Sequence, residues 1–94
     1  MKLKNYLTEI FIEDAKTDKE MLRVSIIAEL DAANLYERFA SQTDDEQIKK
    51  VMLDIAEEEK VHAGEFESLL KKIDPNFASA KKDGYREVED MEEE

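Results

Sequence analysis

Apolar residues recur at alternating steps of three and four along two long stretches of the chain. This spacing places them on one face of an α-helix, as in helices that pack side by side in a bundle. The stripe within residues 18–41 contains Leu22, Ile26, Glu29, Ala33, Tyr36 and Ala40. The stripe within residues 44–73 contains Ile48, Met52, Ile55, Glu59, His62, Phe66, Leu69 and Ile73. The pattern therefore predicts two amphipathic helices, over residues 18–41 and 44–73.

Capping signals mark where these helices begin and end. "TDKE" from Thr17 and "TDDE" from Thr43 each predict a capping box, in which the Thr hydroxyl accepts from a backbone N–H and the Glu carboxylate reaches back. The short turn near "SQTD" makes the two helices antiparallel. In "IDPN", Asp74 caps and Pro75 begins a short third helix, which we expect to end at Gly84.

These elements predict one all-α domain, an antiparallel two-helix hairpin with a short third helix, over residues 17–83. We expect residues 84–94 to form a poorly ordered acidic tail or a linker. Residues 1–16 form an N-terminal arm, either as a short helix or as an extended segment that packs on a partner. The apolar residues of this arm are Leu3, Leu7, Ile10 and Phe11.

The apolar surface is wider than a lone hairpin can bury. The additional apolar positions are Val24, Ile27, Leu35, Val51 and Val61. A chain of 94 residues without cysteine has no disulfide to compensate for a small core. We therefore expect a homo-oligomer in which two hairpins dimerise into a four-helix bundle.

Charge and cysteine content exclude several classes of function. A net charge of −11 argues against nucleic acid and an anionic membrane surface as partners, and it suits cations. The absence of cysteine excludes a disulfide framework, a thiolate zinc site and an iron–sulfur cluster. We see no signal peptide or transmembrane segment, so we expect a cytoplasmic protein or one enclosed in a cytoplasmic compartment.

Three polar residues, Glu29, Glu59 and His62, interrupt the predicted core stripes. An ionised carboxylate away from water is costly unless it is paired or binds a metal, and no Lys or Arg occupies either stripe. Two readings need no metal. The helix phase is off by one residue and both carboxylates face solvent, or a buried Glu–His pair fixes the helix register.

In the third reading, these three residues form half of a di-iron site. Such a site in a four-helix bundle takes one Glu from each of two helices and one Glu-x-x-His from each of the other two. Glu29 with Glu59 and His62 supplies half of this set, so two chains around a twofold axis supply all of it. The donors favour iron, with manganese and other divalent cations as alternatives. Tyr36 lies seven residues after Glu29, where it either packs in the core or contacts a ligand carboxylate.

The stretches "IIAELDAANLYERFA" and "AEEEKVHAGEF" resemble the encapsulated ferritin family, whose short ferritin-like members associate with encapsulin shells. The similarity covers roughly residues 18–80. It implies iron ligands at Glu29, Glu59 and His62, a tyrosine beside the centre at Tyr36, and a carboxylate at a metal-entry site at Asp31. Ala28 and Leu35 depart from the family pattern. Glu58 and Glu65 are further acidic candidates for iron entry, although each also suits a solvated helix face.

The resemblance also implies an activity and an assembly. Members of the family are ferroxidases that dimerise to complete the iron site, form a ring that is typically a decamer, and deliver oxidised iron to an encapsulin nanocompartment. No shell-targeting peptide is recognisable after the acidic tail. Two alternatives are a metal-nucleated assembly or cargo module without turnover, and a rubrerythrin-like peroxide reductase.

Overall fold

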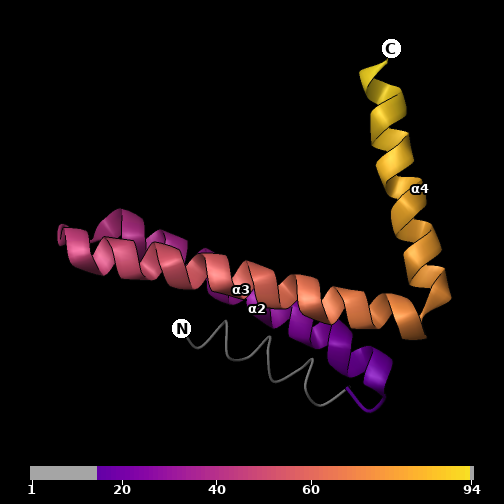
Figure 1. The fold of residues 1–94 in the computed structure, drawn as a ribbon, viewed down its shortest axis with the longest axis horizontal. Helices are drawn as coiled ribbons and strands as arrows, with labels where there is room; N and C mark the ends of the chain where they lie inside the picture. The colour runs from indigo at the N-terminus through magenta and orange to yellow at the C-terminus, as the bar shows by residue number, and fades with distance from the viewer. Residues whose placement is uncertain (1–14, 94) are drawn as a thin grey trace.

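The computed structural model describes residues 15–93, and the helices in this part of the chain are α2 (Asp18–Gln42), α3 (Glu46–Ile73) and α4 (Pro75–Glu92). Helices α2 and α3 form a long antiparallel hairpin, and α4 projects away from its end (Figure 1). The predicted all-α fold with a two-helix hairpin and a C-terminal helix is confirmed.

The first helix begins as the capping signal predicts. The Thr17 hydroxyl accepts from Glu20 N at 3.2 Å, and the Glu20 carboxylate accepts from Thr17 N at 3.2 Å. Two N–H groups that the helix itself leaves unpaired are thereby satisfied. The Thr17 hydroxyl also donates to the Glu20 carboxylate at 2.8 Å. This hydrogen bond, together with the one from Thr17 N, lowers the pKa of Glu20, because the carboxylate is the form that accepts them.

The second capping prediction is wrong, because the N-cap of α3 is Asp45 and not Thr43. The Asp45 carboxylate accepts from Gln47 N at 2.9 Å and from Ile48 N at 3.0 Å. The Thr43 N–H is still bonded to the last turn of α2, and its hydroxyl accepts from Asp45 N at 3.1 Å. Thr43 therefore ends one helix, and a carboxylate that takes two N–H bonds starts the next.

The closest line of contact between α2 and α3 consists of small side chains. Ala33 and Ala40 on α2 and Ala56 and Ala63 on α3 are all at most 6% exposed, and α2 packs against α3. Leu70 continues the line on α3 and is 1% exposed. Because alanine has so short a side chain, this line allows the two helices to approach closely along most of the hairpin.

On α3, the positions next to the alanine line, on its N-terminal side in the sequence, are not buried in the protomer. We call this surface the open flank. It consists of Ile48, Val51, Ile55, His62, Leu69 and Ile73. Ile48, Leu69 and Ile73 were predicted to be core but are 47–50% exposed. Val51, which was predicted only as additional apolar surface, is 50% exposed. Two packed helices bury only a narrow strip of each other, so the rest of the stripe needs a further surface to cover it.

One buried carboxylate joins all three helices at the end of the hairpin. Asp74 is 7% exposed, and its N–H bonds to Leu70 O at the end of α3. Its side chain accepts from Phe77 N at 3.2 Å as the N-cap of α4, and it pairs with Arg23 of α2 at 3.0 Å. The predicted cap at Asp74 and the predicted helix start at Pro75 are confirmed.

The third helix is longer than predicted. We expected it to end at Gly84, but α4 continues to Glu92, so most of the predicted acidic tail is helical. Gly84 has no positive φ, and glycine inside a helix costs only about 1 kcal/mol relative to alanine. It weakens a helix but does not stop one unless the chain turns there. The N-terminal arm predicted at residues 1–16 lies almost wholly outside the described residues.

Candidate metal centre

Helices α2 and α3 bring the three predicted ligands together. Glu29, Glu59 and His62 each offer one ligand atom, and these atoms lie within 4.8 Å of one another. His62 Nδ1 is 3.3 Å from Glu29 Oε2 and 4.0 Å from Glu59 Oε1. Within residues 15–93, this is the group of acidic and histidine side chains whose geometry suits a metal ion.

The hairpin contacts explain why these side chains meet. Glu29 lies one turn before the buried Ala33, and Glu59 lies one turn before the buried Ala63. Each carboxylate therefore lies on the packed side of its helix, and the close approach of the helices along the alanine line lets the two meet across the interface. His62 follows Glu59 by three residues and shares a face with it.

The burial of the three ligands differs. The side chains of Glu29 and Glu59 are 22% and 20% exposed, so the reading in which both carboxylates face solvent is wrong. The His62 side chain is 46% exposed and lies on the open flank, although it was predicted to be core. One edge of the imidazole lies against the two carboxylates, and the other edge is exposed at the surface of the protomer.

Glu29 disfavours the charged form of Glu59. A hydrogen bond with the Glu29 carboxyl raises the pKa of Glu59, and partial burial and the negative charge of Glu29 raise it further. A divalent cation bound between the two groups would offset this repulsion, because it carries two positive charges.

The donor set fits iron. Carboxylate oxygens together with an imidazole nitrogen suit Fe(II), Fe(III) and Mn(II), whereas a site built for copper or structural zinc is richer in His or Cys. Three donors from one protomer do not fill the coordination sphere of an iron ion. Further ligands would have to approach from the open flank, where His62 is exposed.

Two apolar hollows lie on α3 on either side of the cluster. One has a volume of about 340 Å³ and is lined by Asp18, Met21, Leu22, Leu69, Lys72 and Ile73. The other, also about 340 Å³, is lined by Gln47, Ile48, Val51 and Met52. Each lies about ten residues from the ligands along α3, or ~15 Å. The cluster is therefore at the middle of an apolar surface.

The other predicted site residues lie outside the cluster. Tyr36 is half-buried on α2, seven residues after Glu29 and so on a similar helix face. Asp31 is half-buried on α2, and Glu58 and Glu65 are exposed on α3. Asp31, Glu58 and Glu65 do not belong to the group of ligand atoms within 4.8 Å of one another.

The sequence analysis missed two contacts that hold the hairpin in register. Lys60 Nζ lies 2.7 Å from Glu37 Oε2 on α2 and 3.1 Å from Glu57 Oε1 on its own helix, and these carboxylates raise the pKa of Lys60. Arg23 of α2 pairs with Asp74 at the C-terminal end of α3. The spacing of Glu57 and Lys60 is visible in the sequence, but the partners on the facing helix depend on the hairpin register.

Comparison with known proteins identifies the family of this fold. The sequence model of the rubrerythrin family matches residues 20–93, which include all of α3 and α4. The crystal structure of the encapsulated ferritin domain from Pyrococcus furiosus aligns with a TM-score of 0.75 at 50% sequence identity, over 77% of this chain and 74% of that chain. The chain belongs to the encapsulated ferritin family.

Two curated relatives of this encapsulated ferritin are longer proteins. A ferritin-like–encapsulin shell fusion protein of Pyrococcus furiosus is 50% identical over 72 residues, which are 77% of this chain and 21% of the fusion protein. An encapsulin nanocompartment cargo protein of Myxococcus xanthus is 39% identical over 70 residues, which are 71% of this chain and 54% of the relative. No helix in the described part of the encapsulated ferritin is long and apolar enough to cross a membrane.

Proposed function

We propose that this encapsulated ferritin is a ferroxidase whose substrate, Fe(II), binds at a di-iron site completed by a second copy of the chain. The observation that carries the proposal is the cluster of Glu29, Glu59 and His62, whose ligand atoms lie within 4.8 Å of one another beside an exposed apolar flank. It is half of the ligand set that a di-iron four-helix bundle uses.

A twofold axis near the cluster completes the set. It adds a second Glu29, Glu59 and His62 and covers both open flanks. Because the two hollows lie on either side of the cluster, such an axis places the hollow at Leu69 and Ile73 of one copy opposite the hollow at Ile48 and Val51 of its partner. Dimerisation also removes the carboxylates from water, which is costly unless a cation is bound between them. Metal binding and dimerisation are therefore coupled by mass action.

The chain's own residues have distinct roles in this proposal. The Glu29 and Glu59 carboxylates and the His62 imidazole hold Fe(II). Bound iron supplies the electrons that reduce dioxygen. Tyr36 hydrogen-bonds a ligand carboxylate or passes an electron. Asp31, Glu58 and Glu65 raise the local concentration of Fe(II) along its path to the site.

We propose that the assembled protein works inside an encapsulin shell in the cytoplasm. Support comes from the names of its relatives, one an encapsulin cargo protein and the other fused to a shell protein. The copies form a ring, for which the family resemblance suggests a decamer, and the shell stores the oxidised iron. Native mass measurement with and without iron tests the number of copies.

The test of the activity is iron-dependent oxygen uptake. Glu59→Ala and His62→Ala should each abolish it while the far-ultraviolet circular dichroism stays helical. The matched control is Glu57→Ala, which removes an exposed carboxylate from the same helix and leaves the three ligands in place. Full oxygen uptake by the Glu59→Ala/His62→Ala double variant would refute the proposal.

Two further outcomes have their own support. Because His62 is exposed on the open flank, a metal there can join two copies without any turnover. Iron-dependent assembly without oxygen uptake would identify such a metal-nucleated cargo module. The match to the rubrerythrin family makes hydrogen peroxide the second oxidant to compare. Faster iron oxidation with peroxide than with dioxygen would identify a peroxide reductase that takes its electrons from an external donor.

A further inference from the structure

A second set of side chains on the hairpin has the same arrangement as the candidate metal ligands. Lys60 Nζ lies 2.7 Å from Glu37 Oε2 on α2 and 3.1 Å from Glu57 Oε1 on α3. Glu57 and Lys60 are three residues apart, as Glu59 and His62 are in the metal centre. Each set therefore combines one Glu of α2 with a second Glu on α3 and, three residues later on the same face, a side chain that ends in nitrogen.

The two sets differ in that nitrogen-bearing side chain. A neutral imidazole offers a nitrogen lone pair to a metal ion, whereas the ammonium group of a lysine has three N–H donors and no lone pair. The ammonium of Lys60 donates to Glu57 and pairs with Glu37, so it brings a positive charge to both carboxylates. It takes the place that a metal ion would take in the other set.

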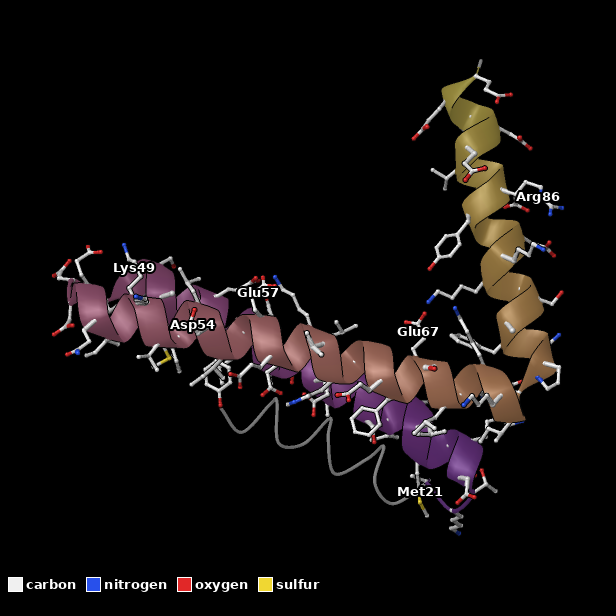
Figure 2. The ribbon with its side chains drawn as sticks, viewed as in Figure 1. Met21, Lys49, Asp54, Glu57, Glu67 and Arg86 are labelled. Carbon is white, nitrogen blue, oxygen red and sulfur yellow. The ribbon has the colours of Figure 1, made fainter. Side chains whose placement is uncertain are left out.

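The second set lies on the side of the hairpin opposite to the open flank. Ile55 and His62 each precede a residue of the alanine line by one position, whereas Glu57 follows Ala56 by one. Since each residue turns the helix by about 100°, these two groups lie on opposite sides of the line. In Figure 2, Glu57 is on the upper edge of the hairpin, and Met21, which lines a hollow at the open flank, is on the lower edge.

A metal ion between Glu37 and Glu57 would be outside the proposed di-iron site. These two side chains are 44% and 74% exposed, whereas the ligand carboxylates Glu29 and Glu59 are 22% and 20% exposed. A second copy that covers the open flank adds no ligand on the opposite side of the hairpin. Two exposed carboxylates in so acidic a chain would nevertheless attract Fe(II) from solution.

We propose that Lys60 is a specificity-determining residue, whose ammonium group keeps Fe(II) out of the Glu37–Glu57 pair and so directs iron to Glu29 and Glu59. The inference rests on the proposed function, because it concerns which carboxylates receive the iron substrate. Of these two carboxylate pairs between α2 and α3, the protein's own cation occupies one, and a cation from solution fills the other.

An ion pair that only holds the register of the helices gives a different expectation. Loss of Lys60 would then weaken the hairpin, and the chain would gain no bound metal. If the ammonium stands in for a metal ion, its loss leaves two carboxylates that both reached one central charge. These carboxylates are then open to a divalent cation, so the gain of a bound ion distinguishes the two roles.

The test measures Mn(II) binding by the full chain in which Glu59→Ala and His62→Ala have removed the metal centre. Mn(II) shares the preference of Fe(II) for carboxylate oxygens, and the paramagnetic resonance signal of the free ion reports how much is bound. Lys60→Met should tighten Mn(II) binding about tenfold or more over this background, because the repulsion by a neighbouring ammonium is removed. Lys60→His should bind Mn(II) more tightly still, because it completes a Glu-x-x-His with Glu57.

Three further variants show whether the gained ion sits at the predicted place. Lys60→Arg keeps a positive charge between the carboxylates and should bind Mn(II) within about twofold of the background. Lys50→Met removes an exposed charge ten residues away on α3 and should also stay within about twofold. Glu37→Gln, added to Lys60→His, should return the affinity to that of the background, because it removes the ligand from α2.

The outcomes that would overturn the proposal are equally defined. One is Mn(II) binding by the Lys60→Met and Lys60→His chains that is no tighter than the background. Others are an equal gain in the Lys60→Arg or Lys50→Met chain, and a gain that survives Glu37→Gln. Because Lys60 is 43% exposed, its replacement leaves the alanine line intact, and circular dichroism verifies that each variant stays helical.

The binding measurement is independent of the ferroxidase test. It uses no oxygen and lacks two of the proposed iron ligands, so it gives a result whether or not the chain oxidises iron. Failure of the proposed function would appear as missing oxygen uptake by the wild type. Failure of the inference about Lys60 would appear as a missing Mn(II) ion in the Lys60→His chain.

Discussion

The imidazole of His62 lies 3.3 Å from the carboxylate of Glu29, a residue 33 positions earlier in the chain. This contact turns a Glu-x-x-His pair on one helix into a three-residue cluster. It exists only because the alanine line of the hairpin brings α2 and α3 close at this level. The interhelical pairs of Lys60 and Arg23 hold the same register on either side of it.

In the metal-free protein, Glu59→Gln should be more stable than the wild type by a margin that increases with pH. The folded-state pKa of this carboxyl is raised above its ordinary value of 4.5, mainly by its hydrogen bond with Glu29. A raised carboxyl pKa contributes stability that is present below about 4.5 and is lost as the pH rises through the folded-state value. The Glu59→Gln variant has no ionisable group at this position, so it does not lose this stability over the same range of pH.

The measurement is thermal unfolding of both proteins with a chelator, from about pH 4 to about pH 8. The advantage of Glu59→Gln over the wild type should grow with pH and then level off. Glu57→Gln is the control, because Glu57 is exposed and pairs with Lys60 instead of another carboxylate. A constant difference between Glu59→Gln and the wild type would contradict the origin of the pKa shift.

A charge on the open flank should prevent dimerisation and thereby reduce the activity. Leu69→Glu places a carboxylate on a flank residue that is 49% exposed and lines one of the hollows, without touching a ligand. We expect it to abolish iron-dependent dimerisation and to reduce oxygen uptake at least about tenfold, because burying an unpaired charge at an interface costs several kcal/mol.

The control for the flank is Val61→Glu, which adds the same charge to α3 at a residue that is 62% exposed and lies outside the flank. Size-exclusion chromatography with light scattering, with and without Fe(II), reads the dimerisation of both variants. Equal behaviour of Leu69→Glu and Val61→Glu would show that the open flank is not the surface across which the site is completed.

Asp74→Ala should be more destabilising than Arg23→Ala. Asp74 is 7% exposed and serves both as the N-cap of α4 and as the partner of Arg23. Its loss should lower the free energy of unfolding by about 1–3 kcal/mol, because a cap and a buried acceptor disappear together. Arg23→Ala should cost at most about 1 kcal/mol, since half of that side chain is exposed to water.

Urea unfolding of the Asp74 and Arg23 variants gives the comparison, and Asp74→Asn isolates the charge because it keeps an oxygen that can cap α4. Asp74→Asn should recover part of the loss. Equal destabilisation by Asp74→Ala and Arg23→Ala would mean that the ion pair, and not the cap, fixes the junction of the three helices.

Neighbouring positions on α3 should respond in opposite ways to a larger side chain. Ala63→Leu overfills the alanine line, where Ala63 is 6% exposed, and should destabilise the hairpin by about 1–3 kcal/mol. Gly64→Ala adds a Cβ that meets nothing within 4 Å and should stabilise the helix by up to about 1 kcal/mol. Thermal unfolding of both variants checks the signs, and a stabilising Ala63→Leu would be incompatible with close packing along that line.

Local chemistry explains which parts of the fold are predictable. The stripes of residues 18–41 and 44–73 predict the hairpin, because helical periodicity and an early turn leave few other arrangements. The capping box at Thr17 and the cap at Asp74 are confirmed for the same reason, since each involves residues three or four positions apart. The predictions at Thr43 and Gly84 failed because the local alternatives differ little in energy. Asp45 is a better N-cap for α3 than Thr43. Gly84 only weakens α4, because the chain makes no turn there.

The sequence by itself determined which residues are available as metal ligands, since Glu29, Glu59 and His62 interrupt two apolar stripes that lack a compensating cation. The tertiary structure decided that these residues meet, that His62 is exposed while both carboxylates are largely covered, and that Lys60 and Arg23 bridge the helices. The physical reason is that helical periodicity fixes only the face on which a side chain lies. Which facing residue it meets, and how much water reaches it, depends on the register and the closeness of two helices, which the alanine line sets.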